Sequence, residues 1–322
     1  SGAVANALPD LSAATFDIEA KGAGIGQSGG NTIEIVASGQ VDAEADGPIH
    51  ITSVAGNALS VGLIDAGSNT VTLVGNNGVI DTGNDAATDI IGTTLTINDG
   101  AAGSAGIIRL DTAVTTLNLI GGDVTIHDGD GIDIAAITAS SLDLLTNGGI
   151  TDSGAVSVTG LAKFNSTGNS IVLGDATTAN FGSLDFSGSA VTISEASAME
   201  IAASEATGAL NLTASGAITQ TGVIDAISTS FFNAGADTIT LTQANDFAGA
   251  VSLSNTGTNL VEVTDANAIN LGTVNVGGAL KVTSSGTITD TGNLTVVGLA
   301  TLVSGGNAIT LGDGTTANFG SV

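Results

Sequence analysis

A short stretch that begins at His127 contains residue types that could bind a metal ion. It reads HDGDGIDI and offers one imidazole and the carboxylates of Asp128, Asp130 and Asp133. Carboxylates spaced along a glycine-containing loop are typical calcium ligands. The glycine-rich calcium nonapeptides, however, require carboxylates that recur every nine residues, and this recurrence is missing here. We therefore expect solvated corner acids and assign no metal site, with calcium binding at this loop as the alternative.

Later copies of the same stretch support that choice. The positions of Asp130 and Asp133 are occupied by Ser197 and Glu200 in one copy and by Asn267 and Asn270 in another. Only the position of Asp128 remains acidic, as Glu195 and Asp265. A set of ligands that changes from copy to copy does not indicate a repeated metal site.

The sequence assembles no catalytic group that we can identify. Arg109 is the only arginine, His50 and His127 are the only histidines, and cysteine is absent. β-Helix enzymes that cleave acidic polysaccharides need basic groups to stabilise developing negative charge. A nucleophilic triad or a zinc site lacks its parts. We predict that the chain is not an enzyme and holds no cofactor, although a glycosidase-type carboxylate pair remains an alternative.

Two further patterns have ordinary structural interpretations. Thr238, Thr240 and Thr242 alternate as in an ice-binding face, but the pattern does not recur in the matching copies, so we expect outer-face threonines. Asn165, Asn211 and Asn293 lie in N-x-S/T sequons, which matter only where a glycosylation system acts on them.

Composition excludes several classes of function. The 322 residues include 47 Gly, 2 Pro, no Trp, no Tyr and no Cys, with 42% hydrophobic residues and a net charge of −27. The hydrophobic content is too high for disorder, and small side chains suit a narrow, repeated core. A polyanion neither neutralises phosphates nor binds anionic membranes, and no apolar run is long enough to span a bilayer. We expect no nucleic-acid partner and no membrane insertion.

An internal repeat of about 70 residues organises the chain, and a fixed period of this kind is the signature of a repeat architecture. Val191–Leu212 aligns without gaps with Val261–Val282, at an offset of 70. A second motif ends at Gly83, Gly154, Gly222 and Gly292, at spacings of 71, 68 and 70. The segments Leu173–Ser183 and Leu311–Ser321 differ at one position and lie two periods apart. Three unrelated anchors thus agree on the same period.

Short strands with frequent corners fill each repeat. Triplets such as Ile269–Leu271 alternate apolar and other residues. Ser194–Leu210, despite its helix-like composition, aligns with strand-like residues in the next copy. An Asn or Asp that tolerates the left-handed conformation precedes most triplets: Asn31, Asn57, Asn69, Asn169, Asp237, Asn267 and Asn307. We predict an all-β, parallel β-helix, continuous over residues 1–322, with roughly 14 rungs of about 23 residues.

The segments Leu210–Gly222 (LNLTASGAITQTG) and Leu280–Gly292 (LKVTSSGTITDTG) resemble repeats of filamentous-haemagglutinin-like exoproteins and large autotransporter adhesins of Gram-negative bacteria. The resemblance implies a right-handed β-helix, export through the outer membrane, and an adhesive or spacer fibre. Because Val322 falls within a repeat, we expect the chain to be part of a longer array.

Three functions follow as hypotheses. The first is a structural rod of an extracellular filament, matrix fibre or adhesin stalk at a bacterial cell surface, in contact with its own copies or neighbouring repeats. The second is a module that binds a glycan or a surface receptor. The third, a carbohydrate-active β-helix enzyme, requires the chemistry that the sequence does not show.

Overall fold

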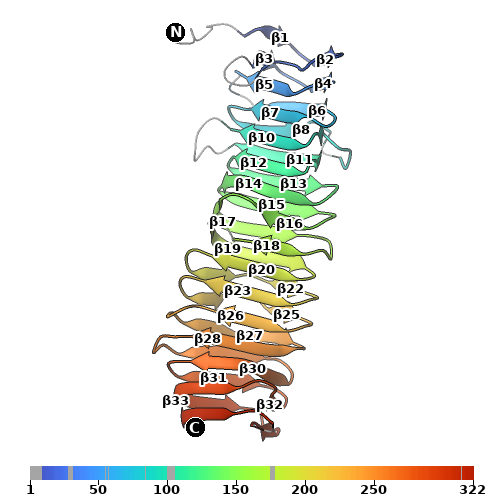
Figure 1. The fold of residues 1–322 in the computed structure, drawn as a ribbon. Helices are drawn as coiled ribbons and strands as arrows, with labels where there is room; N and C mark the ends of the chain where they lie inside the picture. Colours follow the sequence, from blue (N-terminus) through green and yellow to red (C-terminus); the bar gives the residue numbers. More distant parts are fainter. Residues whose placement is uncertain are drawn as a thin grey trace. The chain divides into compact units, whose positions relative to one another are not determined.

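The structure is a computed structural model that describes residues 9–27, 32–54, 56, 58–83, 85–99, 106–174, 178–312 and 314–322. It comprises two compact units, residues 1–160 (unit 1) and residues 161–322 (unit 2). In each unit, strands from successive turns lie side by side and pair in parallel (Figure 1). No described residue is helical, so none belongs to a helix that could cross a membrane. The prediction of an all-β parallel solenoid is confirmed, with about 15 turns in total.

The strands are short. Those that begin in unit 1 are β1 (Leu11–Ala13), β2 (Phe16–Ala20), β3 (Ile33–Ala37), β4 (Val41–Ala45), β5 (Ile49–Ser53), β6 (Leu59–Asp65), β7 (Thr70–Val74), β8 (Gly78–Asp81), β9 (Ile90–Ile91), β10 (Thr94–Asn98), β11 (Ile107–Ala113), β12 (Thr116–Ile120), β13 (Asp123–Asp128), β14 (Ile132–Ala139), β15 (Ser141–Thr146), β16 (Ile150–Asp152) and β17 (Val156–Asn165). Those of unit 2 are β18 (Ile171–Leu173), β19 (Ala179–Gly188), β20 (Val191–Glu195), β21 (Met199–Ile201), β22 (Ser204–Ala206), β23 (Leu210–Ala214), β24 (Ile218–Gln220), β25 (Ile224–Ala226), β26 (Ser230–Asn233), β27 (Ile239–Phe247), β28 (Ala250–Asn255), β29 (Val261–Asp265), β30 (Ile269–Val276), β31 (Leu280–Ser284), β32 (Ile288–Asp290), β33 (Leu294–Val303), β34 (Ile309–Thr310) and β35 (Ala317–Ser321).

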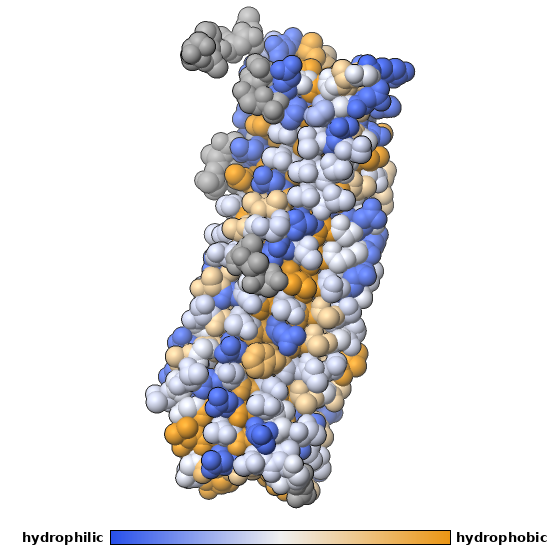
Figure 2. Space-filling view, viewed as in Figure 1, coloured by the Kyte–Doolittle hydropathy of each residue, from blue (hydrophilic) through white to orange (hydrophobic). Residues whose placement is uncertain are grey.

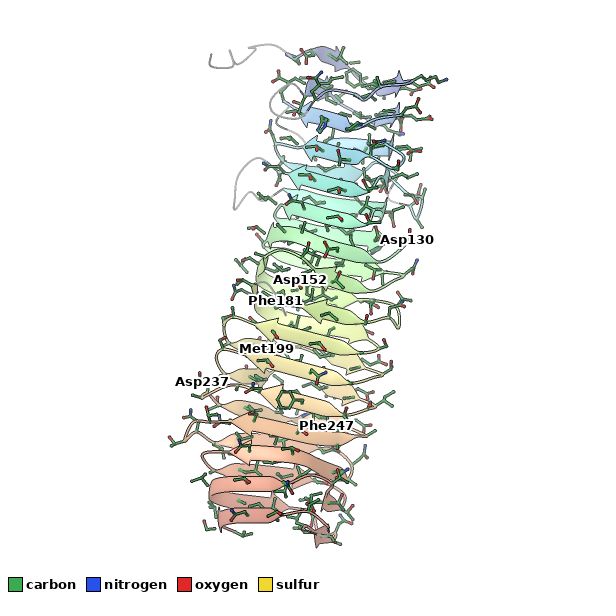
Figure 3. The ribbon with its side chains drawn as sticks, viewed as in Figure 1. Asp130, Asp152, Phe181, Met199, Asp237 and Phe247 are labelled. Atoms are coloured by element: carbon green, nitrogen blue, oxygen red, sulfur yellow. The ribbon has the colours of Figure 1, made fainter. Side chains whose placement is uncertain are left out.

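Alternating burial explains why these residues form strands. In β20, Val191, Ile193 and Glu195 are buried while the residues between them are partly exposed. This period of two matches a strand with one face on the core. The helix-like composition that begins at Ser194 is overridden, as predicted, and Met199 lies buried on β21 (Figure 3).

The asparagines described at the corners form hydrogen bonds within the turn, but they do not adopt the left-handed conformation that the sequence suggests. The backbone N–H of Asn169 donates to the Ser166 carbonyl at 3.0 Å, and its side-chain Nδ2 donates to the same oxygen at 2.9 Å. The left-handed conformation that we expected of the Asn is adopted by Gly168 (φ 81°) and Thr167 (φ 48°) instead. The backbone bond of this turn recurs at Asn69, Asp237 and Asn307. Asn31 and Asn57 lie outside the described residues.

In three of its four copies, the glycine that ends the second repeated motif is required by close packing between turns. A Cβ on Gly154 would overlap the backbone of Ala135, and one on Gly222 would overlap the backbone of the turn before it. Gly292 is equally crowded by Gly272. Only glycine allows the backbones of adjacent turns to approach so closely at this corner.

Turns in unit 2 contain about 20 residues each, fewer than the roughly 23 that we predicted from the usual size of such rungs. Val191 is aligned with Leu210, then with Ser230 and Val251, so that three turns separate Val191 from Val251. We call this column of strands stack A; it contains β20, β23, β26, β28 and β30.

The sequence repeat therefore contains three and a half turns. A second column, stack B, contains β21, β24, β27, β29 and β31, and aligns Met199 with Ile218, Ile239 and Val261. Val261 is the repeat equivalent of Val191, yet it lies in stack B, whereas Val191 lies in stack A. A third column aligns Ser204 with Ile224 and Asp225 with Asp246. Successive copies of one sequence thus begin in different columns.

The cores of the units differ in residue type. In unit 2, two edge-to-face aromatic pairs lie in the interior, Phe164 with Phe181 and Phe232 with Phe247, at centroid distances of 5.6 and 5.8 Å. Buried side chains described in unit 1 are mostly Ile, Leu and Val.

The step along the chain between paired strands is irregular in unit 1. It is short from Ile108 to its partner Val124, and much longer from Val79 to its partner Ile108. The long step adds chain outside the regular turn.

Candidate functional site

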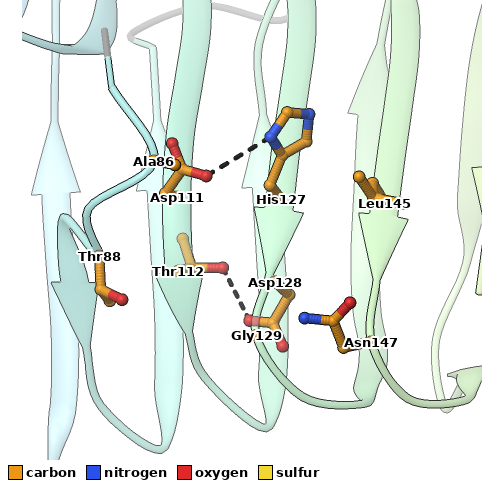
Figure 4. Close-up of a pocket in the computed structure, with 9 residues that line it drawn as sticks. All are labelled: Ala86, Thr88, Asp111, Thr112, His127, Asp128, Gly129, Leu145 and Asn147. Atoms are coloured by element: carbon orange, nitrogen blue, oxygen red, sulfur yellow. Dashed lines mark hydrogen bonds and ion pairs between the residues drawn. The ribbon is translucent and has the colours of Figure 1, made fainter. Parts of the chain in front are cut away.

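The residues of the predicted calcium loop do not converge on one point. His127 lies on the outer face of β13, and its Nδ1 is 3.4 Å from Asp111 Oδ1 on β11 (Figure 4). Asp130 is exposed at the corner (Figure 3). Asp133 accepts hydrogen bonds from the hydroxyls of Thr151 and Ser153, at 3.3 and 2.5 Å. Each side chain therefore serves a separate contact.

Asp128 is buried, which corrects the expectation of a solvated acid at this position. The residue is 3% exposed. Its Oδ2 accepts hydrogen bonds from Thr112 Oγ1 at 2.7 Å and from the Val114 N–H at 3.1 Å, and its Oδ1 accepts from the Asp130 N–H at 2.9 Å. Burial raises the pKa of Asp128 above its ordinary value, against the opposing effect of these donors. The carboxyl group joins one turn to the next.

Glu195 and Asp265 perform the same task in later copies. Glu195 Oε1 accepts from the Phe181 N–H and from Ser197 Oγ, both at 3.0 Å. Asp265 accepts from the Phe247 N–H at 3.0 Å and from the Asn267 N–H at 2.7 Å. Burial raises the pKa of each acid. The acidic position that the repeats retain is therefore structural, because it satisfies buried backbone donors that would otherwise be unpaired.

The other candidates lie apart from one another. Arg109 is exposed on the outer face of β11. His50 is buried on β5, and burial lowers its pKa. Thr240 aligns with Thr219 on the preceding turn but with Glu262 on the next, so this stack is no threonine ladder.

All three sequon asparagines have hydrogen-bond partners. Asn165 and Asn293 accept backbone N–H groups of Thr167 and Thr316, at 2.9 and 3.1 Å. Asn211 is exposed on β23, and its Nδ2 donates to Thr192 Oγ1 at 3.5 Å. Nothing in these contacts assigns the sequons a role.

A cluster of three acids forms where the sequence indicates none. Carboxylate oxygens of Asp81, Asp89 and Asp111 all lie within 4.8 Å of one another. Asp81 ends β8, Asp111 lies on β11, and Asp89 comes from the connection before β9. The cluster depends on strand register, because residues that are distant in the chain become neighbours on adjacent turns.

Asp89 is the most perturbed member of the cluster. It is only 4% exposed, and its Oδ2 accepts the Asp111 N–H at 2.8 Å. Burial raises the pKa of Asp89 to about 7; the Asp111 N–H opposes this, and the charges of Asp81, Asp111 and Asp85 add to it. A carboxyl group with this pKa exchanges its proton near neutral pH.

Three adjoining hollows surround the cluster in unit 1. The hollow of Figure 4, about 280 Å³, is lined by Asp111, His127 and Asn147 among others. A second, of about 190 Å³, shares Asp111 and His127 with it, and a third, of about 250 Å³, shares Asp81 and Asp85 with the second. Thr88 lines both the first and the third. We call these three hollows together the unit 1 groove.

Residues 121–184, 188–254 and 257–322 match a family of repeats of unknown function (DUF5649). The chain belongs to this family. The DUF5649 repeats begin at positions 121, 188 and 257, in agreement with the period found in the sequence, and Asp128, Glu195 and Asp265 occupy their eighth or ninth positions. No curated protein and no solved structure matches the chain.

The DUF5649 matches divide the candidate sites into two kinds. The buried acids that join turns lie inside the matched repeats, whereas Asp81, Asp89 and Asp111 precede residue 121. The repeats thus account for the scaffold, and the unit 1 groove is formed largely by residues before them.

Proposed function

We propose that the chain is the structural rod or stalk of an extracellular bacterial filament, matrix fibre or surface adhesin, and that it is not an enzyme. The observation that carries this proposal is a comparison of two copies of the repeat. Most residues that face the interior are retained in character between the copies, whereas several that face solvent are not. Selection for a continuous core, without selection for a repeated outer surface, is what a scaffold requires.

Particular positions show the contrast. Val191, Met199 and Leu210 are buried, and their equivalents Val261, Ile269 and Leu280 are buried and apolar as well. On the outer face, Thr192 is replaced by Glu262 and Asn211 by Lys281. The visible surface of both units is mostly polar (Figure 2). Interior shape is therefore kept while exterior chemistry changes.

Further features agree with a secreted stalk. The net charge of −27 opposes binding to nucleic acids and to anionic membranes. Resemblance of Leu210–Gly222 and Leu280–Gly292 to adhesin repeats favours a bacterial cell surface as the location. The acids of the unit 1 groove have only His127 and Arg109 beside them as basic groups in the described lining, which favours binding over catalysis. Contacts with its own copies or with neighbouring repeats would extend such a stalk.

Electron microscopy of the purified chain tests the proposal directly. Thin rods or fibres are expected, and compact particles would contradict it. A variant that lacks residues 192–261 removes three and a half turns, so its largest dimension in small-angle X-ray scattering should fall by about 17 Å, at about 4.8 Å per turn. An unchanged dimension would show that the repeats do not act as spacers.

A binding module is the second candidate function, and the unit 1 groove favours it. Function in solenoids concentrates where insertions extend the turns on one face. The long step between Val79 and Ile108 is such an insertion, and it supplies Asp81, Asp85 and Asp89 to the groove. A glycan or a surface receptor could bind there while the rest of the chain acts as a stalk.

A further inference from the structure

The unit 1 groove follows the strands over several turns. Its lining begins at Gln40 and Asp42 near β4 and continues across β6, β8, β11 and β13 to Asn147 after β15. Five steps between paired strands, at about 4.8 Å each, give a length of roughly 24 Å. This length fits an extended polymer better than a single small molecule.

The groove carries a mixed but strongly acidic lining. Asp42, Asp81, Asp85, Asp89 and Asp111 supply carboxylates along its length. Neutral hydrogen-bonding groups lie between and beside them, on Gln40, Thr88, Thr125 and Asn147. The carboxylates repel anionic polymers and attract cationic ones, and the neutral groups suit hydroxyls.

The central cluster has the geometry of an ammonium site. A protonated amine has three N–H donors, and three acceptors about 2.8 Å from its nitrogen lie roughly 4.6 Å apart. The carboxylate oxygens of Asp81, Asp89 and Asp111 lie within 4.8 Å of one another. A cation at this point would also relieve the repulsion that accompanies the ionisation of Asp89.

The strand pairing around the groove disfavours a peptide. β8 pairs with β6 and β11, and β11 pairs with β8 and β13, so both edges of each strand are occupied. A peptide therefore cannot add as a further strand there. Leu63 and Leu145 offer small apolar patches beside polar groups. Patches of this size suit the C–H face of a sugar ring.

We propose that the unit 1 groove binds an extended glycan that carries free amino groups, with Asp81, Asp89 and Asp111 around one ammonium. Hydroxyls of neighbouring sugars bind Thr88 and Asn147. This inference rests on the binding role given above as the second candidate function, and the stalk role does not depend on it.

Calorimetric titration of the full chain tests the proposal with two probes of equal length, a hexamer of glucosamine and a hexamer of N-acetylglucosamine. The buffer is near neutral, so that the sugar amines keep much of their positive charge while Asp89 can ionise, and it contains EDTA, so that no divalent ion bridges the partners. The glucosamine hexamer is expected to bind about tenfold or more tightly than the acetylated one. Equal affinity for the two probes would overturn the proposal.

Matched variants separate the groove from general attraction to an acidic protein. Asp111→Asn keeps the side-chain shape and should weaken glucosamine binding about tenfold. Asp237→Asn changes an exposed corner acid of unit 2 that is not part of the groove lining, removes the same charge, and should leave the affinity unchanged. Equal losses in both variants would mean that binding is non-specific. Rods in the electron microscope together with such equal losses would overturn the glycan site and leave the stalk intact.

Hexalysine tests the competing class of ligand. If it binds as tightly as the glucosamine hexamer and is weakened equally by Asp111→Asn, the site recognises cationic peptides and the glycan assignment is wrong. Binding at least about tenfold weaker is the expected result, because hexalysine has no hydroxyls for the neutral lining groups.

Discussion

Replacement of Asp89 by Asn should stabilise the protein at neutral and alkaline pH and have little effect near pH 4. The pKa of Asp89 is raised to about 7 in the folded state, from an ordinary value of 3.8. An acid whose folded-state pKa is raised stabilises the fold fully below its unfolded pKa, and this contribution is lost as the pH rises through 7. Asn cannot ionise, and its Oδ1 can still accept the Asp111 N–H.

The size of the effect follows from the pKa difference. About three pKa units at 1.36 kcal/mol each give an upper limit of roughly 4 kcal/mol at pH 8. Local relaxation lowers this figure, and we expect Asp89→Asn to gain about 2–4 kcal/mol there. At about 2–4 °C per kcal/mol for a unit of this size, the melting temperature rises by about 5–15 °C.

Thermal unfolding followed by far-UV circular dichroism, repeated between pH 4 and pH 8, measures this gain. Wild type and Asp89→Asn should melt nearly together near pH 4, separate progressively between pH 4 and pH 7, and differ by a constant amount above pH 7. Asp237→Asn, which removes an exposed acid, controls for the general effect of net charge. A constant difference across the pH range, or a variant less stable than wild type at pH 8, would refute the reasoning about burial.

Three further predictions concern the scaffold. Asp265→Ala should destabilise unit 2 by about 1–3 kcal/mol in urea unfolding, because the backbone N–H groups that bind the buried carboxylate lose their acceptor. The control Asp237→Ala should change the stability little. Equal effects of the two substitutions would contradict the role of Asp265 in joining turns. Phe232→Ala should lower the free energy of unfolding by about 3–5 kcal/mol because it opens a cavity in the core. Substitution of the neighbouring, partly exposed Phe231 by Ala should lower it by less than about 1 kcal/mol. A larger loss for Phe231→Ala would show that Phe231, and not Phe232, lies in the core. Chelation with EDTA should barely move the thermal midpoint, since the retained acids bind backbone and hydroxyl donors; a fall of tens of degrees would reveal a structural metal.

The fold class was predictable because the interior follows a simple rule that repeats. Apolar residues two apart, such as Val191 and Ile193, mark a strand with one buried face, and their recurrence at a fixed period marks a solenoid. Comparison of the copies also showed that the segment after Ser194 forms strands despite its helix-like composition. One copy alone does not contain that information. Repetition supplies information about the buried face that local composition lacks.

The number of residues per turn was not predictable from the period alone. The period suggests three equal turns, but strand register gives three and a half, with Val191 in stack A and Val261 in stack B. Inward residues of the two stacks are similar enough to exchange places, so the sequence contains no mark that distinguishes a whole turn from a half turn. Only pairing between strands decides the matter.

The acids of the predicted calcium loop differ in burial, a difference that we did not predict from the sequence. Asp128 and Asp130 are two residues apart, yet one points into the core and the other into solvent. Strand alternation predicts the inward direction of Asp128, but its hydrogen bonds to Thr112 and Val114 depend on the preceding turn. The cluster of Asp81, Asp89 and Asp111 is likewise a product of register, since these residues share no sequence motif.

The half-turn offset also bears on where a specific binding site can arise. An outer-face motif beside Val191 in one DUF5649 repeat lies on stack A, and its equivalent beside Val261 lies on stack B. A partner fixed to one side would therefore not meet the motif in every copy. The equivalent outer residues Thr192 and Glu262 differ between copies, which is expected if no partner binds the same surface of every copy. In unit 1, by contrast, the step from Val79 to Ile108 inserts chain once and builds a surface that no later copy shares. A site for a specific ligand is therefore favoured where an insertion interrupts the regular repeat. Where the repeat is regular, the chain is suited to a continuous scaffold.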